Sequence, residues 1–214
     1  MKWSEYTWAQ AEGIYNAILE HPFVIELADG SLPREKFLFY LGQDARYLES
    51  YFRVLAHIAS RLGNKAHAET FIRFASDGIA VEKALHQSFL KGMTLPAKSP
   101  TCALYTATEM STAYESVAVE AASILPCFWV YRNVGRHILR TCRDIGHNPY
   151  AQWIETYADE YFDKATDEAI EICDQLAQSV SENERLRMTD IFLTCTRLEW
   201  MFWDSAYHLE KWKI

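Results

Sequence analysis

The chain of 214 residues is half hydrophobic and 14% aromatic, and its formal net charge is -8. This length fits one large domain or two small ones, and the apolar content is enough for a sizeable core. The acidic balance argues against nucleic acid or an anionic membrane as a partner, because both require clustered Lys and Arg.

Apolar residues recur at helical spacing along the whole chain, and Gly and Pro are too scarce to interrupt long elements. No alternating run bounded by turns indicates a strand. We therefore expect an all-α fold, a multi-helix bundle in a single domain over residues 1–214. The predicted helices are, in chain order, 5–20, 22–28, 33–62, 65–91, 101–113, 115–124, 126–144, 150–178 as one helix or two in tandem, and 183–211.

Several helix ends are predicted from residues that start or stop helices. Asp29-Gly30 ends the second helix, and Gly92 ends the fourth. Pro126 is expected to begin a helix, since proline is favoured in the first turn. Ser181 is expected to cap the last helix, with Glu184 completing a capping box.

The five cysteines are odd in number and widely spaced, and they form no Cys-x-x-Cys pair. This pattern favours free thiols in a reducing cytoplasm over disulfides or a zinc site. The N-terminus lacks the continuous apolar segment of a signal peptide, and no segment reaches 18 apolar residues without a charge, so no membrane span is expected. No Glu-x-x-His, phosphate-binding loop or dinucleotide fingerprint occurs, so no metal site or nucleotide cofactor is predicted.

A thiol directly follows a proline in the segment Leu125–Tyr131. If Pro126 begins a helix, Cys127 feels the positive end of the helix dipole, which favours the nucleophilic thiolate. Tyr131 follows one turn later on the same face. The alternative is a small buried core residue, which is the commoner role of a free cysteine.

One face of the predicted helix 33–62 carries a carboxylate among tyrosines. Asp44, Tyr47 and Tyr51 share this face, and Tyr40 lies one turn earlier. Burying an Asp without a partner is costly, so Asp44 is either hydrogen-bonded inside the fold or positioned for a ligand. The alternative places it at the wet rim, paired with an arginine such as Arg46 or Arg53.

The last predicted helix carries Glu199 among large aromatic residues. Phe202 and Trp203 share its face, and such surroundings raise the pKa of a carboxyl group by desolvation. Glu199 is therefore either a general acid/base near neutral pH or a core residue held by a tyrosine hydroxyl or an arginine. By themselves, the aromatic stripe from Tyr150 to Tyr157 and the helical Tyr105 do not distinguish core packing from a ligand pocket.

A thiol, two carboxylates and several tyrosines on different helices suit a flat heteroaromatic ligand, which needs aromatic walls and few polar groups. A carboxylate can bind the paired donor edge of a protonated amino-substituted ring.

The order and spacing of these residues resemble the TenA family of thiaminase II and aminopyrimidine aminohydrolase proteins. The matching motifs cover residues 21–207: His21-Pro22-Phe23, Gly30-Ser31-Leu32, Phe37, Tyr40, Gln43-Asp44-x-x-Tyr47-Leu48, Leu125-Pro126-Cys127-x-x-x-Tyr131, Asn148-Pro149-Tyr150-x-x-Trp153-Ile154-x-x-Tyr157 and Glu199-x-x-Phe202-Trp203-Asp204-x-Ala206.

The resemblance implies a helical fold like that of haem oxygenase, assembled as a homotetramer. It implies a cofactor-free hydrolase that replaces the 5-aminomethyl amine of 4-amino-5-aminomethyl-2-methylpyrimidine with hydroxyl, a step of thiamin salvage, and that can cleave thiamin. Because the chain has Cys127, it resembles the cysteine-bearing branch of the family.

The resemblance also implies roles for individual residues. Cys127 resembles the nucleophile, Glu199 the acid/base, and Asp44 the carboxylate that binds the aminopyrimidine edge. The residues that resemble the substrate pocket are Tyr47, Tyr105, Tyr131, Tyr157 and Phe202, although the spacing from Tyr105 to Cys127 is one residue shorter than expected.

Two alternatives use the same fold. The first is a regulatory protein that binds a pyrimidine without turning it over, against which the intact Cys127 and Glu199 argue. The second is a haem-binding enzyme with His21 as axial ligand, for which the His21-Pro22 turn is a poor location.

Overall fold

The computed structural model describes residues 1–90, 94–142 and 144–214, with side chains outside 81–88. The described part contains helices and no strand, as the all-α prediction requires. The α-helices are α1 (Trp3–Leu19), α2 (Pro22–Asp29), α3 (Arg34–Arg61), α4 (Lys65–Phe89), α5 (Pro100–Ser111), α6 (Val117–Thr141), α7 (Ala151–Tyr157), α8 (Glu160–Ser179) and α9 (Glu182–Tyr207), with short 3₁₀ helices η1 (Thr112–Tyr114) and η2 (Ile145–His147).

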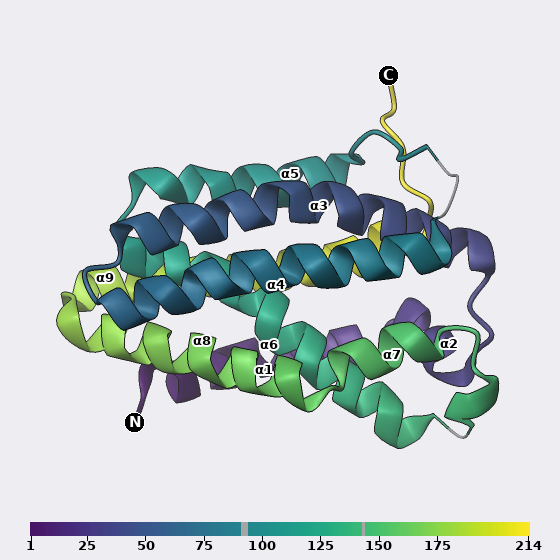
Figure 1. Cartoon of the computed structure of the whole chain (residues 1–214), viewed down its shortest axis with the longest axis horizontal. Helices are drawn as coiled ribbons and strands as arrows, with labels where there is room; N and C mark the ends of the chain where they lie inside the picture. The colour runs from purple at the N-terminus through teal and green to yellow at the C-terminus, as the bar shows by residue number, and fades with distance from the viewer. Residues whose placement is uncertain (91–93, 143) are drawn as a thin grey trace.

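The helices α3, α4, α5 and α8 lie roughly parallel to the longest axis of the molecule, with α3 between α4 and α5, whereas α6 crosses obliquely (Figure 1). The helix α6 packs against α3, α7, α8 and α9, so most of its length is buried. Faces of α3, α5, α6 and α9 therefore meet in the interior, where the core is rich in aromatic rings. None of the described helices is long and apolar enough to cross a membrane.

Side-chain caps fix where several helices begin. Ser99 accepts a hydrogen bond from the backbone N–H of Cys102 at the start of α5, and Ser116 does the same for Val119 at the start of α6. Ser181 accepts from the N–H of Glu184, which is the predicted cap of α9. Each cap satisfies a backbone donor that has no partner within its helix.

Most predicted helix ends agree with the structure to within a few residues. Gly30 has φ +79° and ends α2 in the left-handed conformation that glycine adopts without strain. The range 150–178 forms two helices, α7 and α8, and α9 ends at Tyr207 instead of residue 211. The predicted stop at Gly92 lies outside the described residues.

The prediction that Pro126 begins a helix is wrong. Residues predicted as two helices form the single helix α6, and Pro126 lies in its interior. An interior proline removes one backbone hydrogen bond and costs about 3 kcal/mol. The neighbouring residues Ile124 and Leu125 are fully buried, and packing of this kind outweighs the cost. Cys127 consequently lies far from the helix N-terminus, and the dipole argument for its thiolate does not apply.

Candidate active site

The tyrosine-rich face of α3 points into the core. Asp44 is 4% exposed, which excludes the expected alternative of a wet rim position. Arg46 instead pairs with Glu49 on the outer face, where its Nη1 lies 3.1 Å from Oε1. The helical spacing that put Asp44 on the face of Tyr47 thus places a carboxylate inside the molecule.

Glu199 lies on the buried face of α9 and is 1% exposed. Its Oε1 accepts a hydrogen bond of 2.7 Å from the Tyr105 hydroxyl on α5. Burial raises the pKa of the Glu199 carboxyl, the hydrogen bond from Tyr105 lowers it and the negative charge of Asp44 raises it, and together they bring it to about 8. The tyrosine contact of the second sequence interpretation is therefore present, and a carboxyl group with this pKa is largely protonated at neutral pH. Its role as a general acid/base stays a prediction.

Cys127 is half-buried in the middle of α6. Burial raises the pKa of its thiol well above the usual value, and the nearby charges of Glu199 and Glu109 raise it further. A hydrogen bond with the Tyr47 hydroxyl lowers the pKa of the thiol. The surroundings of Cys127 thus disfavour an extra negative charge, and a thiolate needs an acceptor for its proton.

A pocket of about 330 Å³ reaches Cys127 from the surface. It lies between α3, α4, α6, α7 and α8, and its wall is mostly apolar. Its lining includes Cys127, Tyr157 and the aromatic residues Tyr51, Phe74, Phe128 and Phe162. Of the predicted site residues, Cys127 and Tyr157 line this pocket, and the others are not part of its lining. The role of Cys127 as nucleophile stays a prediction.

The remaining predicted site residues form one aromatic cluster around these groups. The ring of Tyr47 lies 4.8 Å from that of Tyr105 and 6.0 Å from that of Phe202, measured between centroids. The ring of Tyr131 lies 4.9 Å from that of Tyr157. The eight predicted residues come from α3, α5, α6, α7 and α9, and the fold brings them together.

Sequence reasoning missed Glu109. This residue lies on α5, is fully buried, and accepts a hydrogen bond of 2.7 Å from the Tyr47 hydroxyl. Burial raises the pKa of the Glu109 carboxyl well above its usual value of 4.5. The one available signal was its position four residues after Tyr105, which puts both side chains on the same helical face.

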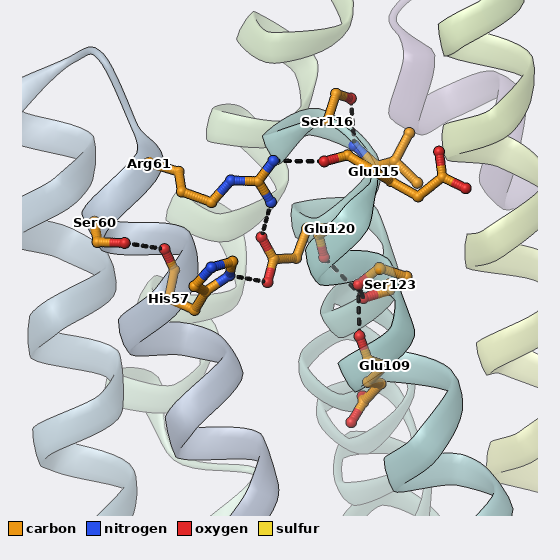
Figure 2. Close-up of polar contacts among 10 residues, drawn as sticks. His57, Ser60, Arg61, Glu109, Glu115, Ser116, Glu120 and Ser123 are labelled. Carbon is orange, nitrogen blue, oxygen red and sulfur yellow. Dashed lines mark hydrogen bonds and ion pairs between the residues drawn. The ribbon is translucent and has the colours of Figure 1, made fainter.

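A separate ionic network lies between α3 and α6, apart from the aromatic cluster (Figure 2). The buried carboxylate of Glu120 on α6 contacts Arg61 at 2.5 Å and His57 at 2.7 Å, both on α3. Ser123 donates to the backbone carbonyl of Glu120 at 2.8 Å. In Figure 2 the Glu109 side chain points away from this ion cluster. The network joins α3 to α6, while the Glu109 carboxyl faces Tyr47.

His21 is occupied by contacts within the fold. Its Nδ1 accepts a hydrogen bond of 3.1 Å from the Phe23 backbone N–H, and its Nε2 lies 3.3 Å from Asp204 Oδ1. The side chain caps α2 and is 5% exposed. These contacts engage both ring nitrogens, which argues against the axial-ligand alternative.

Comparison with known proteins gives consistent matches over almost the whole chain. The profile of the TENA/THI-4/PQQC family matches residues 8–209. An aminopyrimidine aminohydrolase of Halalkalibacterium halodurans is 31% identical over 99% of this chain and 98% of its own length. The corresponding figures for an aminopyrimidine aminohydrolase of Bacillus subtilis are 32%, 99% and 92%. A solved TenA homologue from P. horikoshii OT3 superposes with a TM-score of 0.86 at 28% identity, covering 97% of this chain and 99% of that one.

Proposed function

Since the chain belongs to the TENA/THI-4/PQQC family, we propose that it is an aminopyrimidine aminohydrolase of thiamin salvage. The reaction replaces the 5-aminomethyl amine of 4-amino-5-aminomethyl-2-methylpyrimidine with hydroxyl and releases ammonia. The observation that carries the proposal is that Cys127, Asp44 and Glu199 interact electrostatically in one aromatic interior, with a pocket that reaches the thiol. Thiamin has the same pyrimidine and is a second candidate substrate.

Asp44 is the group proposed to bind the pyrimidine. A carboxylate accepts two hydrogen bonds from the ring nitrogen and the adjacent amine when the ring is protonated. The burial of Asp44 strengthens such a bond, because little water competes for the carboxylate. The rings of Tyr47, Tyr105, Tyr131, Tyr157 and Phe202 supply apolar walls for the flat substrate.

Cys127 is proposed as the nucleophile. Addition of its thiolate to an electron-poor ring carbon breaks the aromaticity of the pyrimidine, and the protonated edge held by Asp44 stabilises the added electrons. The adduct then expels the amine from the exocyclic carbon. Direct displacement by water lacks this assistance, which explains why the reaction needs a thiol.

Glu199 is proposed as the acid and then the base. With a pKa of about 8 it is largely protonated at neutral pH and can donate its proton to the leaving amine. The resulting carboxylate takes a proton from water as the water adds to the exocyclic methylene. Expulsion of the Cys127 thiolate restores the aromatic ring, and the enzyme returns to its starting state.

Ammonia release from the aminomethyl pyrimidine tests this function. The wild-type protein should release ammonia, and Cys127→Ser should lower the turnover at least roughly 100-fold, because a hydroxyl is a much weaker nucleophile. Cys142→Ser, at the end of the same helix, is the matched control and should retain activity. A protein that binds the pyrimidine in calorimetry without releasing ammonia would instead be the regulatory binder.

Assembly and location are part of the same proposal. We expect a homotetramer, as the family resemblance implies. The five free thiols support action in the reducing cytoplasm, where a nucleophilic cysteine remains reduced.

A further inference from the structure

Glu109 is a buried carboxyl group to which the proposed reaction assigns no role. Its side chain is fully buried on α5, and only one of its oxygens has a partner: Oε1 accepts a hydrogen bond of 2.7 Å from Tyr47. Among the described atoms, Oε2 has no hydrogen-bond partner. A carboxyl oxygen left unpaired in a core is costly, so its retention calls for an explanation.

Tyr47 connects this carboxyl group to the nucleophile. The Tyr47 hydroxyl is a hydrogen-bonding neighbour of the Cys127 thiol as well as the donor to Glu109. Its ring is 3% exposed and lies between those of Tyr51 and Tyr105, with centroids 5.3 Å and 4.8 Å away. These contacts hold the hydroxyl in place beside both groups: it donates to Oε1 of Glu109 at 2.7 Å, and it lowers the pKa of the Cys127 thiol.

The charges near Cys127 explain what this arrangement can do. An isolated thiolate would add a negative charge to an interior that already contains Glu199 and Glu109, and both raise the pKa of the thiol. Moving the proton to a neighbouring carboxylate leaves the total charge unchanged. We propose that Glu109 takes up the Cys127 proton through the Tyr47 hydroxyl when the thiolate forms, and so acts as a positioning residue.

The transfer is balanced at each atom. The S–H bond of Cys127 breaks and its proton passes to the Tyr47 oxygen, while the Tyr47 O–H bond breaks and that proton passes to Oε1 of Glu109. Before the step the thiol donates to Tyr47, which donates to the carboxylate. After it the carboxylic acid donates to Tyr47, which donates to the thiolate. The hydroxyl therefore has a hydrogen-bond partner on each side in both states.

Groups from every neighbouring element affect the titration of Glu109. Tyr47 bonds to it from α3, and its donated hydrogen bond lowers the pKa of the Glu109 carboxyl. The Glu199 charge on α9 raises that pKa, and the Lys98 ammonium before α5 lowers it. The other titratable groups in electrostatic contact with Glu109 are Tyr51 on α3, Tyr105 on α5, Cys127 on α6 and Cys195 on α9, together with Cys102 on α5.

Two other side chains near Cys127, Tyr51 and Glu199, do not provide a relay from the thiol to a carboxyl group. Tyr51 also neighbours the Cys127 thiol, but its hydroxyl donates to the Ile124 backbone carbonyl at 3.0 Å, and a carbonyl cannot take up a proton. Glu199 is a carboxyl group, but its hydrogen bond is to Tyr105. Of these tyrosines, Tyr47 is the one that joins the thiol to a carboxyl group.

The test is the pH dependence of Cys127 alkylation by iodoacetamide, followed by peptide mass spectrometry. The pocket of about 330 Å³ gives this small reagent access, and no pyrimidine is needed. The alkylation rate of the wild-type protein should rise with pH in two separate steps, which are the lower and the upper limb of the profile. The lower limb follows ionisation of Glu109, and the upper limb follows direct loss of the thiol proton. Cys142 in the same digest serves as the internal reference thiol.

The variants separate the relay from a general structural effect. Glu109→Gln keeps the shape of the side chain and should lose the lower limb, with a rate about tenfold or more lower near neutral pH and unchanged on the upper limb. Tyr47→Phe should lose the same limb, and adding Glu109→Gln to it should change nothing further. Tyr51→Phe is the matched control, and it should retain the lower limb. If Glu109→Gln does not fold, Tyr47→Phe alone tests the same limb.

Three results would overturn the inference: a lower limb that persists in Glu109→Gln, a rate reduced equally at every pH, or a lower limb abolished by Glu199→Gln but not by Glu109→Gln. The inference rests on the proposed function only in making Cys127 the nucleophile. A two-limbed alkylation profile without ammonia release would therefore refute the proposed reaction while supporting the relay.

Discussion

Burial controls the protonation of Glu199, and this has a consequence for stability. The carboxyl pKa is near 4.5 in an unfolded chain and about 8 in the fold. Between these values the folded state keeps a proton that the unfolded state has lost, so the free energy of unfolding falls as pH rises through this window. The slope from this group is at most about 1.4 kcal/mol per pH unit.

Glu199→Gln should remove this pH-dependent loss. We expect the variant to become progressively more stable than wild type from about pH 5 to pH 8, with a constant difference above that, by urea unfolding at a series of pH values. Glu69→Gln on the exposed surface of α4 is the control. A difference between wild type and Glu199→Gln that does not change with pH would contradict the raised pKa. Glu199→Gln should also lower the rate of ammonia release about 100-fold or more.

Asp44 is expected to act through charge rather than shape. Asp44→Asn preserves the volume of the side chain but removes the charge that a protonated pyrimidine edge would meet. A hydrogen bond to a charged partner contributes roughly 1.5–3 kcal/mol, so kcat/KM should fall roughly 10- to 100-fold. Glu49→Gln, on the outer face of the same helix, should leave kcat/KM unchanged. Equal kinetics for Asp44→Asn and wild type would exclude Asp44 from substrate binding.

Close packing of α7 against α6 positions part of the site at the level of elements. A Cβ at Gly135 of α6 would lie 2.8 Å from the backbone carbonyl carbon of Tyr157, so α7 can approach only a glycine there. The short helix α7 carries Trp153 and Tyr157 toward Tyr131 and α9. A glycine inside α6 lowers helix propensity, and the contact with α7 explains its presence.

Gly135→Ala should displace α7 and so affect both stability and catalysis. We expect a loss of about 1–3 kcal/mol in the free energy of unfolding from overpacking, together with reduced ammonia release. Gly13→Ala in α1 is the matched control, because nothing lies within 4 Å of its Cβ, and it should stabilise the fold by up to about 1 kcal/mol. Equal stability of Gly135→Ala and wild type would show that α7 tolerates the shift.

At the scale of the molecule, several large apolar side chains are exposed on the surface of the single chain. Tyr114 in η1 is 95% exposed, and Ile72 of α4 and Met110 of α5 are 59% and 51% exposed. Such residues are suited to contacts between subunits, although single exposed apolar side chains also occur on monomers.

The proposed homotetramer gives a direct measurement. Light scattering should report four times the chain mass of 24.8 kDa. Because association stabilises the folded state, the midpoint of thermal unfolding should rise with protein concentration. A monomer mass with a midpoint independent of concentration would refute the tetramer.

Denaturation of the proposed single domain should show one cooperative transition by both circular dichroism and calorimetry.

The helices could be predicted from the sequence because the spacing of apolar residues is a local pattern, which can be read without knowing the contacts between helices. Prediction from the sequence failed at Pro126, where local propensity predicts a helix start. The surrounding residues of α6 are buried, and their packing against other helices stabilises a helix that continues past the proline. It also left two interpretations of Glu199, because spacing along one helix does not reveal Tyr105 on another.

The sequence by itself determined the all-α class, the Ser181 cap of α9, the Gly30 stop of α2 and the order of motifs by which the family is recognised. Tertiary structure decided which polar groups lose water and which of them meet. Glu109 shows the difference, because its role depends on Tyr47, 62 residues away in the chain, and on a thiol of a third helix. Contacts between helices set the protonation of the groups around Cys127, since burial and neighbouring charges act through space rather than along the sequence.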